Sequence, residues 1–357
     1  MHTVVHIVQK MAPGGIETLV LDLVLANKNT YVVSLEGKKD ALISAWPNLA
    51  ALQNRFIALE KPDGLVFSLI FKLFNLLRLL KAYAVVMHHI GPLVYGGVGA
   101  RLAGIKVRVH VEHDGWHYAQ KRRRQIGWLL DFIVDPRKVA VSHATAKLVS
   151  NALNSDYIEI IPNGVDMSCF KPANRFEARE RLNLPQNVIL VGTVGRLVHV
   201  KGQDVLVKAV ALLPDNVHLV LAGDGTERAA LQALGKEFGV SKRLHFLGHR
   251  NDAQMIYPAF DVFCLPSRAE GFPRSLIEAQ ACNIRVIATD VGGSKEAVCP
   301  QTGSLAVPDN PQRLADVIKT VIHQTVFQSP RSFVNPKFSF ERTKDAYNQI
   351  VESSLIP

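Results

Sequence analysis

Short β-branched runs alternate with longer amphipathic runs along the whole chain, and this alternation constrains the fold more than any other feature. Strand-like runs that alternate with helical ones are typical of α/β proteins with mostly parallel sheets. The chain has 357 residues, which is too many for one ordinary hydrophobic core. We therefore expect two domains, each built by repeating the order strand, helix, strand.

The expected elements fall into two sets. Strands of the first half are expected at Thr3–Val8, Thr30–Ser34, Arg55–Ala58, Ala84–Met87, Val107–Val111, Lys138–Val141 and Ile158–Ile161. Its helices are expected at Ile16–Asn27, Val66–Lys81, Val94–Ala103, the Gln120–Leu130 region and His143–Ala152. Strands of the second half are expected at Val188–Val194, Val217–Ala222, Leu244–Leu247, Val262–Leu265 and Arg285–Thr289. Its helices are expected at Gln203–Leu212, Glu227–Phe238, Asp252–Ala259 and Ser275–Ala281.

Two further segments shape the domain organisation. The polar stretch 166–187 holds two prolines and many charges, so it predicts a hinge between the halves. A last amphipathic run from Phe338 predicts a C-terminal helix.

Composition limits the class of protein. Hydrophobic residues make up 48% and charged residues 20% of the chain, a normal globular balance. The longest apolar run, from Leu65, is interrupted by Lys72, Arg78 and Lys81 and falls short of the ~18 apolar residues of a spanning helix. The N-terminus shows no cleavable secretory signal, and the four cysteines form no CxxC pair. We therefore expect a cytoplasmic protein with reduced thiols.

The formal net charge is +10, and its densest point is KRRR at Lys121 to Arg124. Nucleic acid, an anionic membrane face or phosphorylated ligands could use this charge. The sequence contains no nucleic-acid-binding motif, so we expect no nucleic-acid partner. A plain solvated helix face is an equally weighted explanation of the run.

Two glutamates, Glu270 and Glu278, lie eight residues apart around a Gly-Phe-Pro turn in PSRAEGFPRSLIEA. The stretch follows an expected strand, so Glu270 should lie in a loop and Glu278 inside the next helix. Carboxylates on either side of a bound diphosphate can accept hydrogen bonds from sugar and ribose hydroxyls. A glutamate that only caps a helix start is the ordinary alternative.

The start of that helix is a candidate phosphate site. Pro273 suits the first turn, where its missing N–H costs nothing. Free backbone N–H groups of Arg274, Ser275 and Leu276 would then point toward a ligand at the carboxyl end of a strand. Asn283 lies where a left-handed residue would end the helix.

Two cations flank another loop at a strand end. In VGTVGRLVHVKGQ, Arg196 and Lys201 lie between an expected strand and helix, a placement that suits a diphosphate leaving group. Ordinary surface charge is the alternative. The nearby LAGDG contains Gly223 and Gly225 but lacks the third glycine of a dinucleotide fingerprint.

The first half offers weaker signals. The pair Gly14–Gly15 separates an expected strand from a helix and would allow a ligand to approach the backbone. His113 falls at the carboxyl end of a strand, whereas His110 reads as a packed strand residue; which of the two faces a ligand stays open. One of His88 and His89 could also line the site. The sequence shows no metal-ligand spacing, so we expect no metal.

Together these motifs closely resemble the retaining glycosyltransferases of family 4, which have the GT-B fold. The resemblance covers nearly the whole chain and is most specific in the second half. It rests on GGIE at Gly14, VSHATAK at Val141, IPNGVD at Ile161, VGRLVHVKG at Val194, LAGDG at Leu221, FLG at Phe246, PSRAEGFPRSLIEAQAC at Pro266 and VIATDVGGSKEAV at Val286.

The resemblance implies roles for the second-half residues. Glu270 would meet hydroxyls of the donor sugar, and Glu278 would meet the ribose of the nucleotide. Arg196 and Lys201 would hold the donor diphosphate and act in catalysis with Glu270. The other donor-binding residues that it implies are Gly223, Gly271, Phe272, Pro273, Ser275 and Leu276.

The resemblance also implies the arrangement of the chain. Two Rossmann-like domains with parallel sheets would face each other across a cleft: an acceptor domain over residues 1–168 and a donor domain over residues 169–337. The helix at residues 338–357 would cross back to the first domain. In that domain, Gly15 would approach the phosphates, and His113 would lie near the reacting sugar carbon.

The implied reaction transfers a sugar from a nucleoside-diphosphate sugar to a hydroxyl of a sugar or lipid-linked glycan, with retention and without a metal. The resemblance also implies envelope polysaccharide or lipopolysaccharide synthesis, with peripheral contact on the inner face of an anionic membrane. A nucleotide-sugar epimerase and a non-catalytic donor-binding scaffold are the alternatives. The sequence departs from the family in ACNIRV, with Asn283 and Arg285, and at Arg274 and Ser275, which leaves the donor open.

Overall fold

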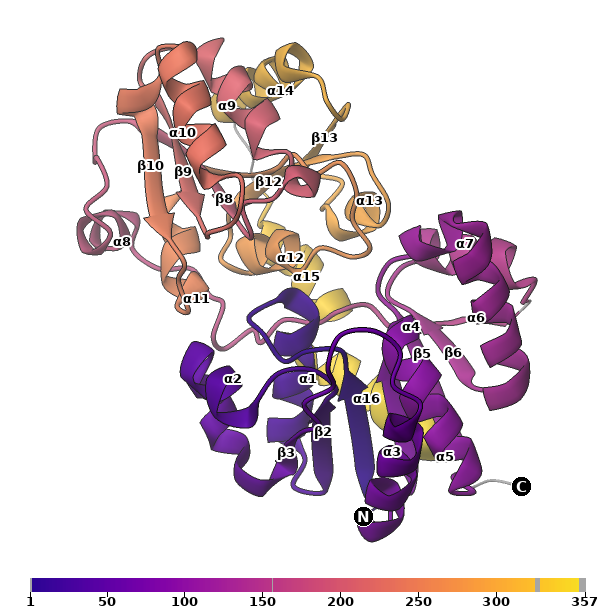
Figure 1. The fold of residues 1–357 in the computed structure, drawn as a ribbon. Helices are drawn as coiled ribbons and strands as arrows, with labels where there is room; N and C mark the ends of the chain where they lie inside the picture. Colours follow the sequence, from indigo (N-terminus) through magenta and orange to yellow (C-terminus); the bar gives the residue numbers. More distant parts are fainter. Residues whose placement is uncertain (1, 156, 325–327, 353–357) are drawn as a thin grey trace. The chain divides into compact units, whose positions relative to one another are not determined.

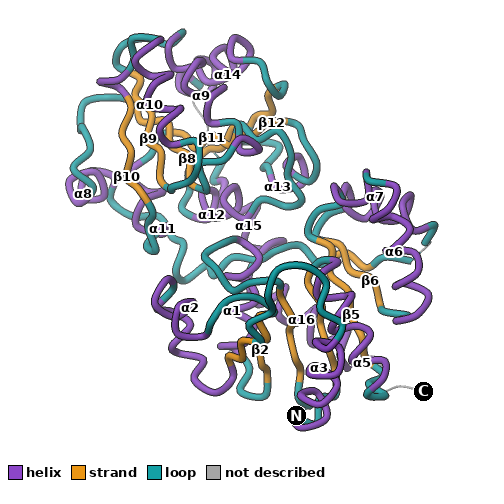
Figure 2. Tube along the Cα trace, viewed as in Figure 1, coloured by secondary structure: helices purple, strands orange, loops and turns teal. Residues whose placement is uncertain are grey.

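The computed structural model describes residues 2–155, 157–324 and 328–352, and the chain divides into two compact units (Figure 1). The first unit comprises residues 1–162 and 343–357, and the second comprises residues 163–342. Each unit is a parallel sheet with helices packed against it, so the predicted α/β class with two Rossmann-like units is confirmed (Figure 2).

The first unit has a seven-stranded sheet in the order β3-β2-β1-β4-β5-β6-β7. All neighbouring strands are parallel. The strands are β1 (Val4–Val8), β2 (Thr30–Ser34), β3 (Phe56–Ala58), β4 (Ala84–His88), β5 (Val107–Glu112), β6 (Arg137–Ala140) and β7 (Glu159–Ile160). The helices are α1 (Gly15–Ala26), α2 (Lys39–Ala45), α3 (Ser68–Leu79), α4 (Ile90–Pro92), α5 (Val98–Leu102), α6 (Lys121–Val134) and α7 (His143–Leu153).

The order of this sheet reverses at β1, which pairs with β2 on one side and β4 on the other. Successive side chains of β1 enter different cores: Val5 and Ile7 pack with the α3 side, and Val8 packs with α1. In open parallel sheets such a reversal opens a crevice at the carboxyl ends of the strands, where ligands bind. The segments that follow β1, β4 and β5 are therefore the place to look for a site in this unit.

The C-terminal helix α16 (Phe340–Glu352) returns to the first unit, as predicted. Thr343 donates from Oγ1 to the carbonyl of Pro162 at 2.9 Å, and Arg137 donates to the carbonyl of Ile350 at 3.1 Å. Because these bonds join residues far apart in sequence, α16 from Thr343 onward is a structural part of the first unit.

The second unit has a six-stranded parallel sheet in the order β10-β9-β8-β11-β12-β13, which reverses at β8. The strands are β8 (Ile189–Val194), β9 (Val217–Ala222), β10 (Leu244–Gly248), β11 (Val262–Leu265), β12 (Arg285–Thr289) and β13 (Ser304–Ala306). The helices are α8 (Arg175–Arg181), α9 (Gln203–Ala211), α10 (Arg228–Glu237), α11 (Ala253–Ile256), α12 (Arg274–Ala281), α13 (Ser294–Ala297), α14 (Pro311–His323) and α15 (Pro330–Phe338).

The predicted hinge at 166–187 is wrong, because this segment is packed into the second unit. It contains α8, whose Arg179 is 1% exposed. Arg179 donates to the carbonyl of Ala259 at 2.9 Å and pairs with Asp261 at 2.6 Å. An arginine buried with several oxygen partners anchors a segment, and removing one partner of such a buried pair typically costs ~3–5 kcal/mol. The two connections between the units lie instead at 162/163 and 342/343.

Smaller differences concern the helices. The segment expected as one helix over Val94–Ala103 is a π-helical turn, Leu93–Gly97, followed by α5. The helices α2, α4, α8, α13, α14 and α15 and the strand β13 were not predicted from the sequence. In the described part of the chain no helix is both long and apolar enough to cross a membrane.

Candidate active site

In the second unit the predicted residues converge at the carboxyl ends of β8 and β11, beside the reversal of the sheet. Strand β11 leads into a loop that carries Glu270, and the helix α12 that follows carries Glu278, as predicted. Asn283 has a φ of +66°, so the predicted left-handed residue after the helix is also confirmed.

The start of α12 differs in detail from the prediction. Pro273 precedes the helix with an extended ψ of 109°, and Arg274 is the first helical residue. The N–H of Leu276 is not free, because it donates to the carbonyl of Pro273 at 3.2 Å. Leu276 is fully buried, so its side chain belongs to the core. The phosphate-binding capacity of this helix end therefore depends on the residues before Leu276.

Lys201 and Glu270 form an ion pair, with Nζ 2.6 Å from Oε1. Ser267 donates to the same carboxylate oxygen at 2.6 Å. The Glu270 side chain is 8% exposed and that of Lys201 is 22% exposed. An ammonium group has three donors, so Lys201 can hold Glu270 and still donate to a phosphate oxygen. This pair joins two residues that the sequence analysis assigned to one site from separate motifs.

Glu278 is held from two sides. Its Oε2 accepts from the Tyr257 hydroxyl at 2.7 Å, and its Oε1 lies 3.5 Å from Nε of Arg274. Burial and the adjacent Glu278 carboxylate raise the pKa of Tyr257 well above its usual value, so Tyr257 stays a donor. A carboxylate can accept about four hydrogen bonds, so Glu278 keeps capacity for ligand hydroxyls.

Arg196 lies two residues after β8 and is exposed. Its carbonyl accepts from Gln203 at 2.9 Å, which fixes the loop backbone. Within the described residues no carboxylate pairs with its guanidinium. Arg196 is thus an unneutralised cation in the loop that also carries Lys201.

Arg268 was missed by the sequence analysis. It pairs with Asp204 at 2.8 Å and Asp309 at 2.7 Å, and so ties the Glu270 loop to the start of α9. Although burial alone would raise it, the bond to Arg268 lowers the pKa of Asp204. Arg268 lies inside the PSRAEG stretch, but nothing in a single sequence says which acids it meets.

Glycines allow the loops around these residues to touch backbone to backbone. A Cβ on Gly223, which has a φ of +143°, would lie 1.9 Å from the carbonyl oxygen of Gly195. A Cβ on Gly202 would lie 2.0 Å from the carbonyl of Pro266, and one on Gly292 would lie 1.8 Å from the carbonyl of Glu270. Gly292 was not among the predicted site residues. The Gly-Gly pair that begins three residues after the end of β12 was the available signal.

Two other predicted donor-binding residues have structural contacts. The Phe272 ring is 5% exposed and packs on Phe338 with centroids 5.2 Å apart. Its carbonyl accepts from Asn163 at 3.1 Å. Gly271 is buried, and Ser275 is half-buried at the helix start.

In the first unit, His113 directly follows β5 and is 5% exposed. His110, three residues earlier and inside β5, is also buried, so burial does not separate the two. Gly15 is the first residue of α1, and Gly14 has an extended φ of −169°, so neither needs the left-handed conformation. His89 follows β4 with φ 71° and ψ 174°. Non-glycine residues rarely adopt this conformation, and such strain is concentrated at functional sites.

A buried carboxylate lies beside these histidines. Glu112 accepts from the Tyr118 hydroxyl at 2.8 Å, and both His110 and His117 lie 3.3 Å from its Oε1. Burial raises the pKa of Glu112, but the nearby histidines, chiefly His110 and His117, together lower it by a larger amount. The net pKa lies below its usual value, so Glu112 stays ionised. Burial lowers the pKa of His117, yet Asp114 and Glu112 raise it to about 9. No group of three or more His, Cys, Asp or Glu in the described chain is arranged to hold a metal.

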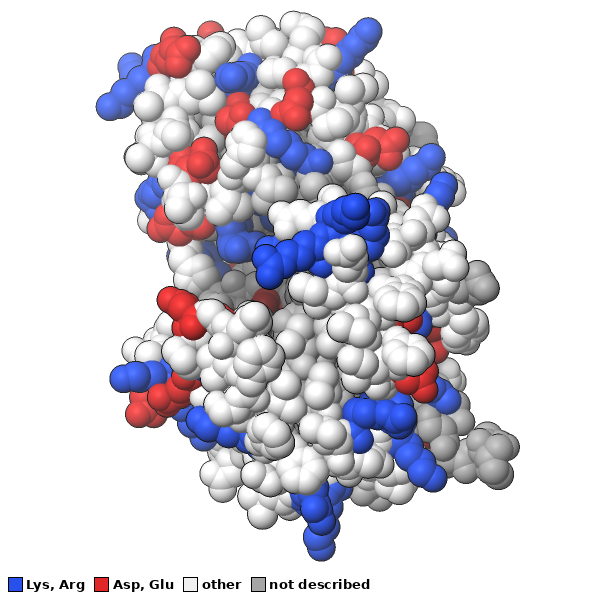
Figure 3. Space-filling view, turned by 45° about the vertical axis from the view of Figure 1, so that its right-hand side comes forward, with Lys and Arg blue, Asp and Glu red and all other residues white. Residues whose placement is uncertain are grey.

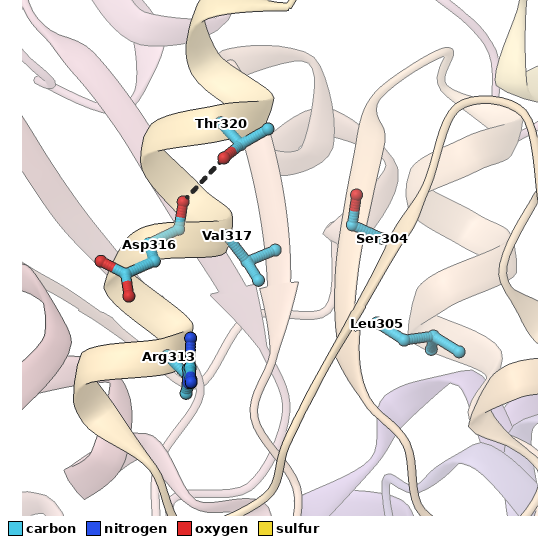
Figure 4. A pocket seen from close by; sticks show the side chains of 6 residues that line it. All are labelled: Ser304, Leu305, Arg313, Asp316, Val317 and Thr320. Atoms are coloured by element: carbon cyan, nitrogen blue, oxygen red, sulfur yellow. Dashed lines mark hydrogen bonds between the residues drawn. The ribbon is translucent and has the colours of Figure 1, made fainter.

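Figure 4 shows a pocket elsewhere in the second unit, between β13 and α14. Its polar lining includes Arg313 and Asp316, and the Asp316 carbonyl accepts from Thr320 at 3.0 Å, an ordinary bond within a helix. None of the predicted site residues lines it.

Two family models match the chain. The one described as Glycosyltransferase Family 4 matches residues 13–168, and the one described as Glycosyl transferases group 1 matches residues 174–335. The chain belongs to glycosyltransferase family 4. The resemblance recognised from the motifs is confirmed.

Curated relatives support this assignment. The D-inositol 3-phosphate glycosyltransferase of Mycolicibacterium gilvum (strain PYR-GCK) is 35% identical over 219 residues, which are 58% of this chain and 49% of that protein. The UDP-Gal:alpha-D-GlcNAc-diphosphoundecaprenol alpha-1,3-galactosyltransferase of Escherichia coli is 33% identical over 242 residues, 62% of each chain. This family 4 chain thus spans about half the length of the first of these relatives.

Solved structures show the same fold. Anabaena HepE, in a complex with UDP and glucose, superposes with a TM-score of 0.85 at 22% identity over 99% of this chain and 100% of that chain. WaaG, a glycosyltransferase involved in lipopolysaccharide biosynthesis, gives a TM-score of 0.68 at 17% identity over 98% of each chain. At these identities the likeness shows the GT-B fold alone.

Gly292→Ala tests whether backbone contact holds the Glu270 loop. The new Cβ would overlap the Glu270 carbonyl, so we expect a loss of about 3 kcal/mol or more in the free energy of unfolding. Gly239→Ala is the matched control, because Gly239 also has a positive φ of +69° but open space around its Cβ. It should cost only the backbone term of about 1–2 kcal/mol. Equal losses in urea unfolding would show that the contact with Glu270 contributes nothing.

Proposed function

We propose that this protein transfers a sugar from a nucleoside-diphosphate sugar to an acceptor hydroxyl, with retention of anomeric configuration. The ion pair between Lys201 and Glu270 carries the proposal. It sets a cation for phosphate beside a carboxylate for sugar hydroxyls, at the end of the sheet where parallel folds bind ligands. The second unit would bind the donor, and the first unit would bind the acceptor.

The diphosphate would lie between the β8–α9 loop and the start of α12. Arg196 and Lys201 would neutralise its charge, and Gly223 would let the backbone approach it. Glu270 would accept hydrogen bonds from the donor sugar, and Glu278 from the ribose. All of these residues except Glu278, which lies in α12, come from three loops that Gly202 and Gly223 bring into backbone contact, which favours one rigid donor site.

Retention is proposed to occur by attack on the face from which the diphosphate leaves. The bond between the anomeric carbon and the diphosphate oxygen breaks, the acceptor oxygen bonds to that carbon, and the acceptor proton passes to the leaving diphosphate. Glu112 fits poorly as a carboxylate nucleophile, because it is 1% exposed and enclosed by Tyr118 and His117. Cations at the leaving group stabilise its growing charge without a metal.

The acceptor is proposed to be a sugar or a lipid-linked glycan in envelope polysaccharide or lipopolysaccharide synthesis. This setting is supported by two similar proteins, the Escherichia coli galactosyltransferase, whose name includes a diphosphoundecaprenol-linked sugar, and WaaG, which is involved in lipopolysaccharide biosynthesis. A similar chain, the D-inositol 3-phosphate glycosyltransferase, carries a different acceptor in its name, so the acceptor screen includes a phosphorylated polyol.

Peripheral contact with an anionic membrane is proposed for α6. The first turn of α6 is Lys121 to Arg124 and has no acidic residue. Cations at the N-terminus of a helix are unfavourable to the helix dipole, so these four residues do not stabilise the helix. Only Gly127, Leu130 and Val134 are buried on this helix, and Phe132 is 78% exposed. Figure 3 shows a dense cluster of Lys and Arg on this side of the molecule. Basic residues beside exposed aromatic ones suit the surface of an anionic bilayer. The exposed apolar side chains of α6 are Ile126, Trp128, Leu129, Phe132 and Ile133.

Vesicle binding tests this surface. We expect the protein to co-sediment with vesicles containing phosphatidylglycerol, and the double variant Trp128→Gln, Phe132→Ser to lose this binding. Phe176→Ser is the control, because Phe176 is 57% exposed in the other unit. Equal binding by the double variant would exclude α6 as the membrane surface.

Product analysis tests the transferase. UDP-, GDP- and ADP-sugars are incubated with sugar, phosphorylated polyol and lipid-linked acceptors, and nucleoside diphosphate release and product configuration are followed by NMR. We expect one donor to give acceptor-dependent release and a product with the donor's anomeric configuration. Lys201→Met should lower kcat by about 100-fold or more, because it removes a leaving-group cation. Lys236→Met, an exposed lysine of the same unit, is the control. Inversion, or an altered nucleotide sugar formed without acceptor, would contradict the proposal.

A further inference from the structure

Three histidines from three adjacent strands form a buried chain in the first unit. His6 lies in β1, His88 ends β4 and His113 follows β5. Nδ1 of His6 is 3.0 Å from Nε2 of His88, and Nδ1 of His88 is 2.9 Å from Nε2 of His113. The three side chains are at most 5% exposed. This histidine chain therefore runs across strands β1, β4 and β5, where the strand order of the sheet reverses, and His113 is at one end of it.

All three rings are neutral at neutral pH. Burial lowers the pKa of His6 to about 4, and burial with neighbouring histidines holds the pKa of His88 and His113 well below 6.5. In the described part of the chain no carboxylate bonds to any of the three. A neutral imidazole has one donor and one acceptor. The two hydrogen bonds must therefore run in the same direction.

This requirement couples the tautomer of His6 to the tautomer of His113. If His88 carries its proton on Nδ1, it donates to Nε2 of His113, and Nδ1 of His113 is then the protonated donor. If His88 carries its proton on Nε2, it donates to His6 and accepts from Nε2 of His113, so Nδ1 of His113 is a bare acceptor. The tautomer of His6 thus fixes the tautomer of His113, which it does not touch.

An unpaired buried polar atom lies at each end of the histidine chain. Nδ1 of His113 is buried with no hydrogen-bond partner among the described residues. His6 packs against Tyr347 of α16 with ring centroids 6.1 Å apart, and the Tyr347 hydroxyl also has no partner in the described chain. An unpaired buried polar atom is costly, and natural proteins keep such atoms mostly where a ligand or water meets them. The strained backbone of His89, next to His88, supports a functional role for this end of the sheet.

We propose that His6 and His88 are positioning residues: they hold His113 neutral in a single tautomer and so present its Nδ1 to a substrate hydroxyl. A hydroxyl suits this atom because it can both donate and accept. The inference rests on the proposed transferase and on the place near the reacting sugar carbon that the family resemblance implies for His113. The coupling of tautomers among the three histidines does not depend on turnover and can be measured without it.

NMR of protein with ¹⁵N-labelled histidine tests the chain directly. We expect His113 to show one tautomer and to stay neutral well below pH 6.5. In His6→Phe, His113 should become a mixture of tautomers although its own contacts are intact. His88→Phe should do the same. His245→Phe is the control, because it removes a similar histidine pair, 3.0 Å from His218, in the other unit.

Kinetics add a second reading once a donor is known. We expect His6→Phe and His88→Phe to lower kcat by at least about tenfold, with KM for the donor within about twofold, as for supporting residues of other sites. An unchanged His113 spectrum in folded His6→Phe would overturn the coupling. Unchanged kcat in a variant whose His113 tautomer has changed would overturn the role in catalysis. If the protein transfers no sugar, the spectra alone still decide whether the chain is coupled.

Discussion

The ion pair between Lys201 and Glu270 is the interaction on which the donor site depends. It joins the loop after β8 to the loop after β11, the two strands at which the second sheet reverses. The same two loops are packed closely through Gly202, where a Cβ would meet the carbonyl of Pro266, and Gly292 leaves room for the carbonyl of Glu270. The parallel sheet brings the loops to one edge, the glycines let them touch, and the pair then orders the charges.

The first unit differs in that most of its notable polar side chains are buried titratable groups. It buries several histidines and one carboxylate where β4 and β5 end. The carboxylate Glu112 lies beside His110 and His117, whereas His6, His88 and His113 bond to one another and leave Nδ1 of His113 without a partner among the described residues. The charge of Glu112 is balanced by a neighbouring histidine, whereas the three histidines of the histidine chain are neutral and their two hydrogen bonds run in one direction. The C-terminal helix closes this unit, so residues at both ends of the chain contribute to its order.

Much of the fold could be predicted from the sequence. Fully buried parallel strands read as unbroken apolar runs, and β2, β9, β11 and β12 have the predicted bounds. Glu270 and Glu278 were placed correctly because strand, turn and helix follow one another locally. Arg179 was missed because a charged run looks solvated until its carbonyl partners are known. The histidine chain was missed because its members are 82 and 25 residues apart and only the strand order makes them neighbours. The engaged N–H of Leu276 depends on the geometry of one turn.

The central claim is that the cations beside Glu270 bind a diphosphate, and calorimetry tests it most directly. UDP, GDP and ADP, each beside its monophosphate, are titrated into the wild type and Lys201→Met. Charge-assisted hydrogen bonds contribute about 1.5–3 kcal/mol, so one diphosphate should bind about 10- to 100-fold more tightly than its monophosphate. This difference should largely vanish in Lys201→Met. Equal binding of the diphosphate and monophosphate by the wild type, or binding by the variant equal to that of the wild type, would contradict the account.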